Sequence, residues 1–216
     1  MVDTALLPAI HEAIKQNELG AVSPYCLSFA CLGSSGASFG IFQGDTNVNH
    51  TARATLMQII QGAGAPTATV TRIMAALGQA CPNGNPLSTA DTTLCNNALS
   101  APAGVQTVDQ MDSTLLQVVL GELDSCIAAA ATVNQTIDPV ALLYIALWVN
   151  MTGAPNMLCS WLSGTAELGQ APPIGPTVTR SNLENYLQAS SYFRLHPRNF
   201  VHMQDSVNIA AALLPQ

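Results

Sequence analysis

The sequence predicts a mainly α fold (α+β), a helical domain that carries one small β-hairpin. Apolar residues recur every three or four positions along most of the chain, which is the helical spacing. Only residues 25–43 change to a spacing of two, around a turn rich in Gly and Ser. The chain has 216 residues, of which 49% are hydrophobic and 9% charged, so it can bury a core unaided.

The first predicted helix carries a carboxylate in an unusual place. Ile10, Ile14 and Glu18 are four positions apart and share one face, and Gly20 is placed to end the helix in a left-handed conformation. Glu18 therefore falls on the core side of the last turn, where burial and the negative end of the helix dipole both raise a carboxyl pKa. A carboxyl that stays protonated near neutral pH can act as a general acid. The alternative is a Glu18 that only rims the helix end in water or caps a neighbouring loop.

The hairpin follows directly. Residues 25–31 alternate large and small side chains, residues 32–36 have turn chemistry, and residues 38–43 can return as a second strand. Asp45 closes this segment. The next helix begins near Thr51 and would be capped by one of the two preceding asparagines, Asn47 or Asn49.

Residues 18–45 resemble the lysozyme-like superfamily. The element Ser-Gly-Ala-Ser-Phe-Gly-Ile-Phe-Gln-Gly-Asp at residues 35–45 is similar to the Gly- and Gln-rich element that follows the catalytic Glu in goose-type lysozymes and lytic transglycosylases. The resemblance implies that Glu18 is the catalytic acid and that Asp45 takes the place of an aspartate that positions water. It also implies that polar groups of this region bind the substrate; the candidates are Tyr25, Ser35, Ser38 and Gln43.

A second helix end supports the same family. Asp138 and Pro139 predict a capped helix start, and residues 140–150 are apolar nearly all round, which is typical of a central helix. The end of this helix is similar to the Tyr-Asn-x-Gly helix end of lysozyme-like enzymes. That similarity adds Tyr144 and Asn150 to the substrate-binding candidates. The alternative, that Tyr144 and Trp148 belong to the core, stays open.

The remaining periodicity predicts further helices and a domain division. Helical spacing covers residues 51–61, 68–77 and 108–131, and a capping box of Ser181 and Glu184 opens one more helix. Prolines and glycines interrupt residues 170–180. We therefore expect a catalytic domain at 1–169, a Pro/Gly linker at 170–180 and a C-terminal helical segment at 181–216 that packs back on the domain.

Six cysteines without any Cys-x-x-Cys spacing favour disulfides over a metal site, so no metal and no cofactor are expected. Cys81 and Cys95 bracket a turn-rich loop and form the favoured pair, although buried free thiols are the alternative. Disulfides imply a secreted or periplasmic protein. No signal segment is visible in the first twenty residues, so the export route stays open.

The charge balance limits the partners. A net charge of −7 with only six Lys and Arg argues against nucleic acid, and no apolar run reaches the ~20 residues of a membrane span. The oligomeric state is not indicated. We expect a polysaccharide substrate and a glycoside hydrolase that cleaves β-1,4-linked amino-sugar glycan, namely a muramidase acting on peptidoglycan. The alternatives are a lytic transglycosylase, a chitosanase- or mannanase-like hydrolase, which the acidic charge slightly favours, and a non-enzymatic glycan-binding protein.

Overall fold

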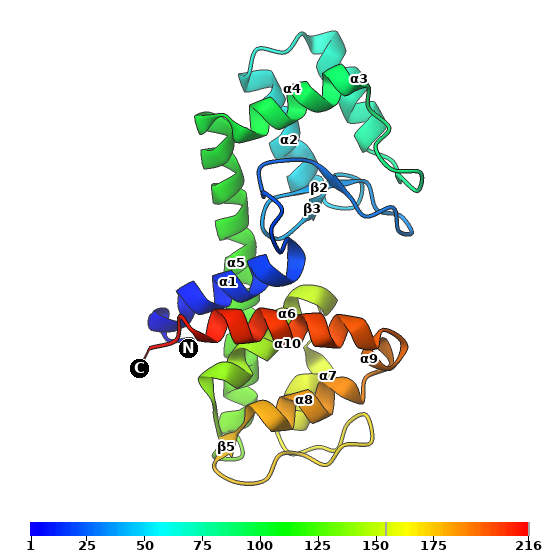
Figure 1. Ribbon diagram of the computed structural model, residues 1–216. Coiled ribbons are helices and arrows are strands. Elements are labelled where there is room, and N and C mark those ends of the chain that lie inside the picture. Colours follow the sequence, from blue (N-terminus) through cyan, green and yellow to red (C-terminus); the bar gives the residue numbers. More distant parts are fainter. Residues whose placement is uncertain (154, 216) are drawn as a thin grey trace. The chain divides into compact units, whose positions relative to one another are not determined.

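A computed structural model describes residues 1–153 and 155–215, and it confirms a mainly helical chain with a small antiparallel sheet (Figure 1). The chain divides into two units. Unit 1 contains residues 1–20 and 116–216, and unit 2 contains residues 21–115. This division differs from the predicted boundary at residue 169. The long helix α5 (Pro102–Ala131) contributes residues to both units.

Unit 1 is built from helices around one apolar helix. Its elements are η1 (Thr4–Leu6), α1 (Leu7–Glu18), β4 (Thr136–Ile137), α6 (Pro139–Thr152), α7 (Asn156–Leu162), β5 (Thr177–Val178), α8 (Arg180–Gln188), α9 (Ser191–Leu195) and α10 (Pro197–Ala211). Unit 2 contains β1 (Ser28–Phe29), β2 (Ala37–Phe39), β3 (Gly44–Asp45), α2 (His50–Gly62), α3 (Thr67–Leu77) and α4 (Thr89–Ser100).

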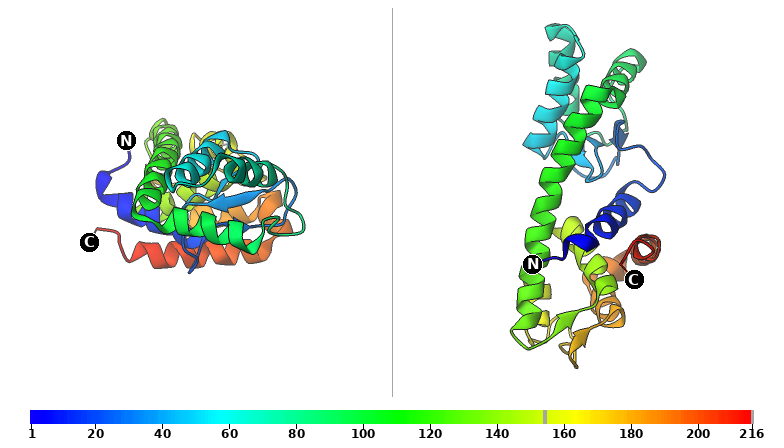
Figure 2. Two further views of the ribbon diagram at one scale, coloured as in Figure 1. Left: turned by 90° about the horizontal axis from the view of Figure 1, so that it is seen from above. Right: turned by 90° about the vertical axis from the view of Figure 1, so that its left-hand side faces the viewer.

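Helix α1 follows its sequence pattern closely. Ala9, Ile10, Ala13 and Ile14 are buried, as the four-residue spacing predicts. Gly20 has φ +55° and its N–H donates to the carbonyl of Gln16 at 3.1 Å, so the helix ends in the predicted left-handed cap. The buried face packs against α10 and α6, and the blue and red helices lie side by side in Figures 1 and 2.

Helix α6 is the centre of unit 1. The Asp138 carboxylate accepts hydrogen bonds from the N–H groups of Val140 at 2.8 Å and Ala141 at 3.3 Å, which confirms the predicted cap. Gly153 ends the helix with φ +61°. The side chains of α6 are buried on all sides of the helix, because α1, α8 and α10 all pack against it. The all-round apolar pattern therefore marks a central helix, as predicted.

The predicted linker is tied into unit 1. Within it, β5 pairs in parallel with β4, and the register sets Thr136 opposite Thr177. The side-chain amide of Gln135 donates to the carbonyls of Pro173 and Gly175, both at 2.8 Å. Helix α8, which follows, is capped by Thr179 and Asn182 instead of the predicted Ser181 and Glu184. The capping box begins two residues earlier because Thr179 still has extended backbone geometry.

The predicted hairpin is a three-stranded sheet in unit 2. Strands β1, β2 and β3 pair in that order, all antiparallel, with Ser38 opposite Ser28 on one side and Asp45 on the other. The strands are shorter than the alternation predicts. The chain turns at Gly40, with φ +77°, and at Gln43, with φ +49°, so the predicted second strand breaks and Asp45 lies on a third.

The core of unit 2 joins this sheet to the helices. Phe39 is fully buried with apolar residues of α2, α3 and α4. Helix α2 is capped by Asn49, one of the two predicted candidates. Helix α4 was not predicted, because that region reads as the loop between Cys81 and Cys95. It begins after Ser88, whose hydroxyl accepts from the Asp91 N–H at 3.1 Å, so Cys95 is a helical residue.

Helix α5 begins six residues before the predicted start at residue 108. Among the described residues, it is the one helix whose length and composition would allow it to cross a membrane. Core helices of soluble proteins meet the same two criteria, so this observation assigns no location to the chain.

Replacing the cap of α6 tests whether this central helix depends on it. We expect Asp138→Ala to lower the free energy of unfolding by about 1 kcal/mol, because two N–H groups lose their acceptor. Urea unfolding followed by circular dichroism measures the change. Asp205→Ala, at an exposed position of α10, is the matched control. Equal stability of the two variants would contradict the capping role.

Candidate functional site

Glu18 is the last residue of α1, and its side chain meets the end of α6. The side-chain amide of Asn150 donates to Glu18 Oε1 at 2.8 Å, and that of Asn17 donates to the same atom at 3.3 Å. Glu18 is partly buried. The structure thus brings together two residues, Glu18 and Asn150, that the sequence nominates from separate motifs 132 positions apart.

The surroundings of Glu18 favour its protonated form. Burial raises the pKa of Glu18, while the amides of Asn17 and Asn150 and the nearby His202 lower it. The raising effect dominates, so the pKa lies above the usual value of a Glu. The carboxyl can therefore hold a proton to a higher pH than an exposed Glu and is suited to give it to a bound group.

His202 is a neighbour that the sequence analysis did not assign to the site. It lies on α10, and its Nε2 is 3.0 Å from the backbone carbonyl oxygen of Asn17. The contact joins residues 185 positions apart, so no local pattern could predict it. Its effect is electrostatic, because a protonated imidazole beside Glu18 favours the carboxylate.

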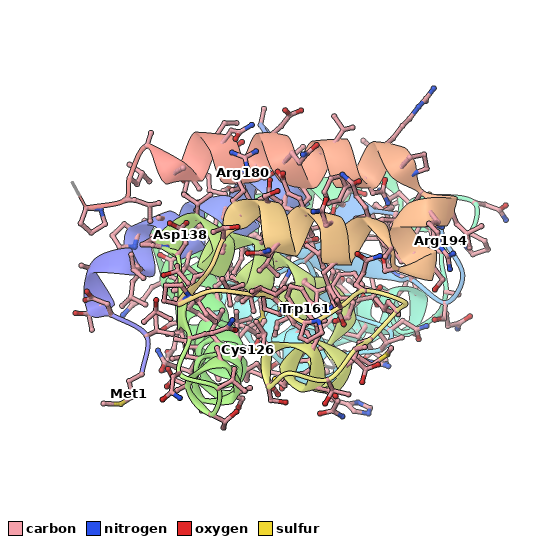
Figure 3. All side chains as sticks on the ribbon, turned by 90° about the horizontal axis from the view of Figure 1, so that it is seen from below. Met1, Cys126, Asp138, Trp161, Arg180 and Arg194 are labelled. Atoms are coloured by element: carbon pink, nitrogen blue, oxygen red, sulfur yellow. The ribbon has the colours of Figure 1, made fainter. Side chains whose placement is uncertain are left out.

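Tyr144 belongs to the core of unit 1, in agreement with the alternative that the sequence left open. It is fully buried, and its hydroxyl donates to Glu184 Oε1 at 2.6 Å. Arg180, labelled in Figure 3, donates from Nε to the same oxygen at 2.9 Å. Burial and Glu184 raise the pKa of Tyr144. The side chain has no exposed surface with which to contact a sugar. Trp148 is half-buried and packs on Phe193, with ring centroids 5.7 Å apart.

Asp45 lies in unit 2, where it organises the loop around the sheet. Its carboxylate accepts from the N–H of Gly36 at 2.9 and 3.1 Å, from that of Asn47 at 2.7 Å and from that of Val48 at 3.3 Å. A Cβ on Gly36 would lie 2.9 Å from Cβ of Asn47, so this close approach needs glycine. The Asp45 carboxylate is thus already bound by three backbone groups.

The polar candidates of the element at residues 35–45 bond to other residues of unit 2, mostly of the small sheet and its turns. Ser28 donates to Gln43 Oε1 at 2.6 Å, and the Gln43 amide donates to the carbonyl of Gly40 at 3.1 Å. Ser38 is 7% exposed and pairs with Asp45 across the sheet. Ser35 is half-buried, and its carbonyl accepts from the Cys81 N–H at 2.7 Å. Ser38, Gln43 and Asp45 are therefore neighbours in one small sheet.

Tyr25, the remaining candidate, is half-buried and faces α5. Its hydroxyl donates to Asp109 Oδ1 at 2.8 Å. Burial and then this hydrogen bond raise the pKa of Tyr25 to about 12. Tyr25 thus fastens the start of the hairpin segment to the part of α5 that belongs to unit 2.

Asp112 is a buried carboxyl that sequence reasoning missed. It is 3% exposed, and it accepts from the N–H of Ile41 at 2.8 Å and, weakly, from that of Phe42 at 3.5 Å. A Cβ on Gly40 would lie 2.6 Å from Asp112 Oδ1, so the glycine makes room for the carboxyl. Burial raises the pKa of Asp112 to about 6, and Asp109 adds to the rise against the two N–H donors.

The site residues therefore fall into two groups. Glu18, Asn150 and His202 meet in unit 1, and Ser38, Gln43 and Asp45 meet in unit 2. Among the described residues, no group of three or more His, Cys, Asp or Glu side chains could hold a metal ion. The chemistry that these groups offer is proton transfer by Glu18 and hydrogen bonding by the amides.

The raised pKa of Asp112 predicts a stability that depends on pH. The folded chain holds this proton more tightly than the unfolded chain, so the stabilisation is complete below pH 3.8 and is lost as the pH rises through about 6. We expect Asp112 to make the free energy of unfolding fall by about 3 kcal/mol from acid to neutral pH.

Urea unfolding at a series of pH values measures this fall. The variant Asp112→Asn should lose it, whereas Asp205→Asn on the surface of α10 should keep it. A fall of unchanged size in Asp112→Asn would contradict the assignment.

No family model matches the sequence. Neither the curated proteins nor the solved structures contain a match.

Proposed function

We propose that this chain cleaves β-1,4-linked amino-sugar glycan, with peptidoglycan as the first substrate and Glu18 as the general acid. The observation that carries the proposal is the hydrogen bond of 2.8 Å between Asn150 and Glu18. Helical periodicity makes Glu18 a candidate acid, and the resemblance to a lysozyme-like helix end makes Asn150 a candidate substrate-binding residue. The bond between them is a reason to assign both residues to one site.

The hydrogen bonds of Glu18 suit a proton donor. Both amides reach Oε1, which fixes the carboxyl group and leaves Oε2 to carry the proton. Burial keeps the group protonated above the usual pH range of a Glu. In the proposed reaction, Oε2 gives its proton to the glycosidic oxygen as the bond to the anomeric carbon breaks. The Asn150 amide then stabilises the carboxylate that is left.

The role of Asp45 decides between two versions of the reaction, hydrolysis and transglycosylation. If it holds the attacking water, the products are hydrolysed sugars. Three backbone groups already occupy its carboxylate, which favours a bracing role. A lytic transglycosylase is therefore the second candidate. In that reaction the 6-hydroxyl of N-acetylmuramic acid attacks the anomeric carbon and gives its proton to the Glu18 carboxylate, and no water is added.

The charge of the chain bears on which glycan it cleaves. The net charge of −7 suits a neutral or cationic polysaccharide better than an anionic wall, so chitosan is the second substrate to test. A glycan-binding protein without activity is the alternative of a different class. It would use the same polar groups but would not need the proton of Glu18.

Replacing Glu18 tests the enzymatic proposal. We expect Glu18→Gln to lower the rate of glycan cleavage at least about 100-fold, because an amide cannot donate the required proton to the leaving oxygen. Clearing of a peptidoglycan suspension and release of reducing ends from chitosan measure the rate. Glu12→Gln on the same helix is the matched control, since Glu12 bonds only to Lys15 and Gln16 of α1 among the described residues.

Cleavage that survives in Glu18→Gln would refute the proposal, and so would glycan binding without cleavage by the native chain. The mass of the products then separates the two versions. Hydrolysis adds one water per bond, whereas the transglycosylase gives an anhydro sugar. Asp45→Asn should keep cleavage if Asp45 only braces the loop.

Replacing Asn150 tests how Glu18 is tuned. Its hydrogen bond lowers the pKa of Glu18, so Asn150→Ala should raise that pKa further. Because the acid must be protonated to act, kcat/KM falls as the pH rises through this pKa, and the fall should move to higher pH in the variant. Asn185→Ala, on the exposed side of α8, should leave the profile in place. An unshifted profile in Asn150→Ala would argue against the proton-donor role.

A further inference from the structure

Two cysteines of unit 1 lie in contact although they are distant in the sequence. The Sγ atoms of Cys126 on α5 and Cys159 on α7 are 3.3 Å apart, and the residues are separated by 33 positions. The other sulfur contacts differ in kind, because the thiols of Cys26, Cys31 and Cys81 each approach a backbone carbonyl oxygen. Cys126 and Cys159 therefore stand out from the favoured pair of the sequence analysis, Cys81 and Cys95.

The two thiols have different access to solvent. Cys126 is fully buried, and it is labelled near Trp161 of α7 in Figure 3. Trp161 packs on Tyr186 with ring centroids 4.6 Å apart, so aromatic rings lie beside this sulfur pair. Burial and the neighbouring thiol raise the pKa of Cys126. Cys159 is half-buried and is the thiol that an oxidant in solution reaches first.

We infer that Cys126 and Cys159 form a disulfide that links α5 to α7, made by exchange with a small disulfide such as oxidised glutathione. The sulfurs must approach from 3.3 Å to about 2.05 Å, a movement of little more than 1 Å. Side-chain rotation and a small shift of α7, a helix of seven residues, can supply it. This inference does not depend on the proposed function.

The exchange balances in two steps. Cys159 loses its proton, and its sulfur attacks the small disulfide; the bond between the two small-molecule sulfurs breaks and one thiolate leaves. Cys126 then loses its proton and attacks the sulfur of Cys159, and the second thiolate leaves. The two protein thiols give up two electrons and two protons, and the small disulfide becomes two thiols.

The disulfide would close a loop that contains the whole of α6. Closing a loop of this length removes conformational freedom from the unfolded chain and stabilises the folded one. The oxidised chain should therefore melt at a higher temperature than the reduced chain. We expect a rise in Tm of about 5–10 °C.

The test incubates the native chain in buffers that range from reduced to oxidised glutathione. Free thiols are blocked with N-ethylmaleimide, and peptides from a chymotrypsin and pepsin digest are analysed by mass spectrometry. The inference expects a linked peptide of Cys126 and Cys159, lighter by two hydrogen atoms than its reduced parts. Oxidation should raise Tm in the native chain and in the control Cys95→Ala, but not in Cys126→Ala or Cys159→Ala.

Two results would overturn the inference. One is blocking of both Cys126 and Cys159 by N-ethylmaleimide after full oxidation of the native chain. The other is a linked peptide that joins Cys126 or Cys159 to a different cysteine, such as Cys95. The peptide map of the native chain decides the matter even where an alanine variant fails to fold. Neither result bears on whether Glu18 cleaves a glycan.

Discussion

The hydrogen bond from Asn150 to Glu18 is the contact on which the functional interpretation depends. It exists because two helices end at the same place: α1 ends at Glu18, two residues before Gly20, and α6 ends at Thr152, just before Gly153. Each helix is anchored by its buried apolar side chains, so the polar ends are held without help from the groups that meet there. The acid is thus placed by packing, and the amide adjusts its proton affinity.

In unit 2 the carboxylates of Asp45 and Asp112 shape the backbone, whereas Glu18 of unit 1 bonds to side-chain amides. Asp45 and Asp112 both accept backbone N–H groups of the glycine-rich element, one from within its loop and one from α5. These bonds hold a segment that has little regular structure of its own. The strands of the small sheet are only two or three residues long. The element that resembles the lysozyme-like family is therefore shaped largely by side-chain acceptors rather than by a strand ladder.

What the sequence could predict was local. The faces of α1 and α6, their ends and the cap at Asp138 all follow from spacing within one or two helical turns. Helix α4 was missed because its Thr and Asn residues are weak helix formers and its apolar side chains form only a narrow stripe. Asp112 and His202 were missed because their partners lie 71 and 185 positions away, and no pattern in one sequence records such distances.

The fit between Gly40 and Asp112 has a consequence for how such chains are recognised. Gly40 is required because the Asp112 carboxyl group occupies the space beside it. This requirement comes from packing and does not depend on catalysis. A descendant that lost its acid at position 18 would still need this glycine to fold. The motif that most readily suggests an enzyme is thus kept by packing, and its survival in a sequence would be no proof that catalysis survives with it.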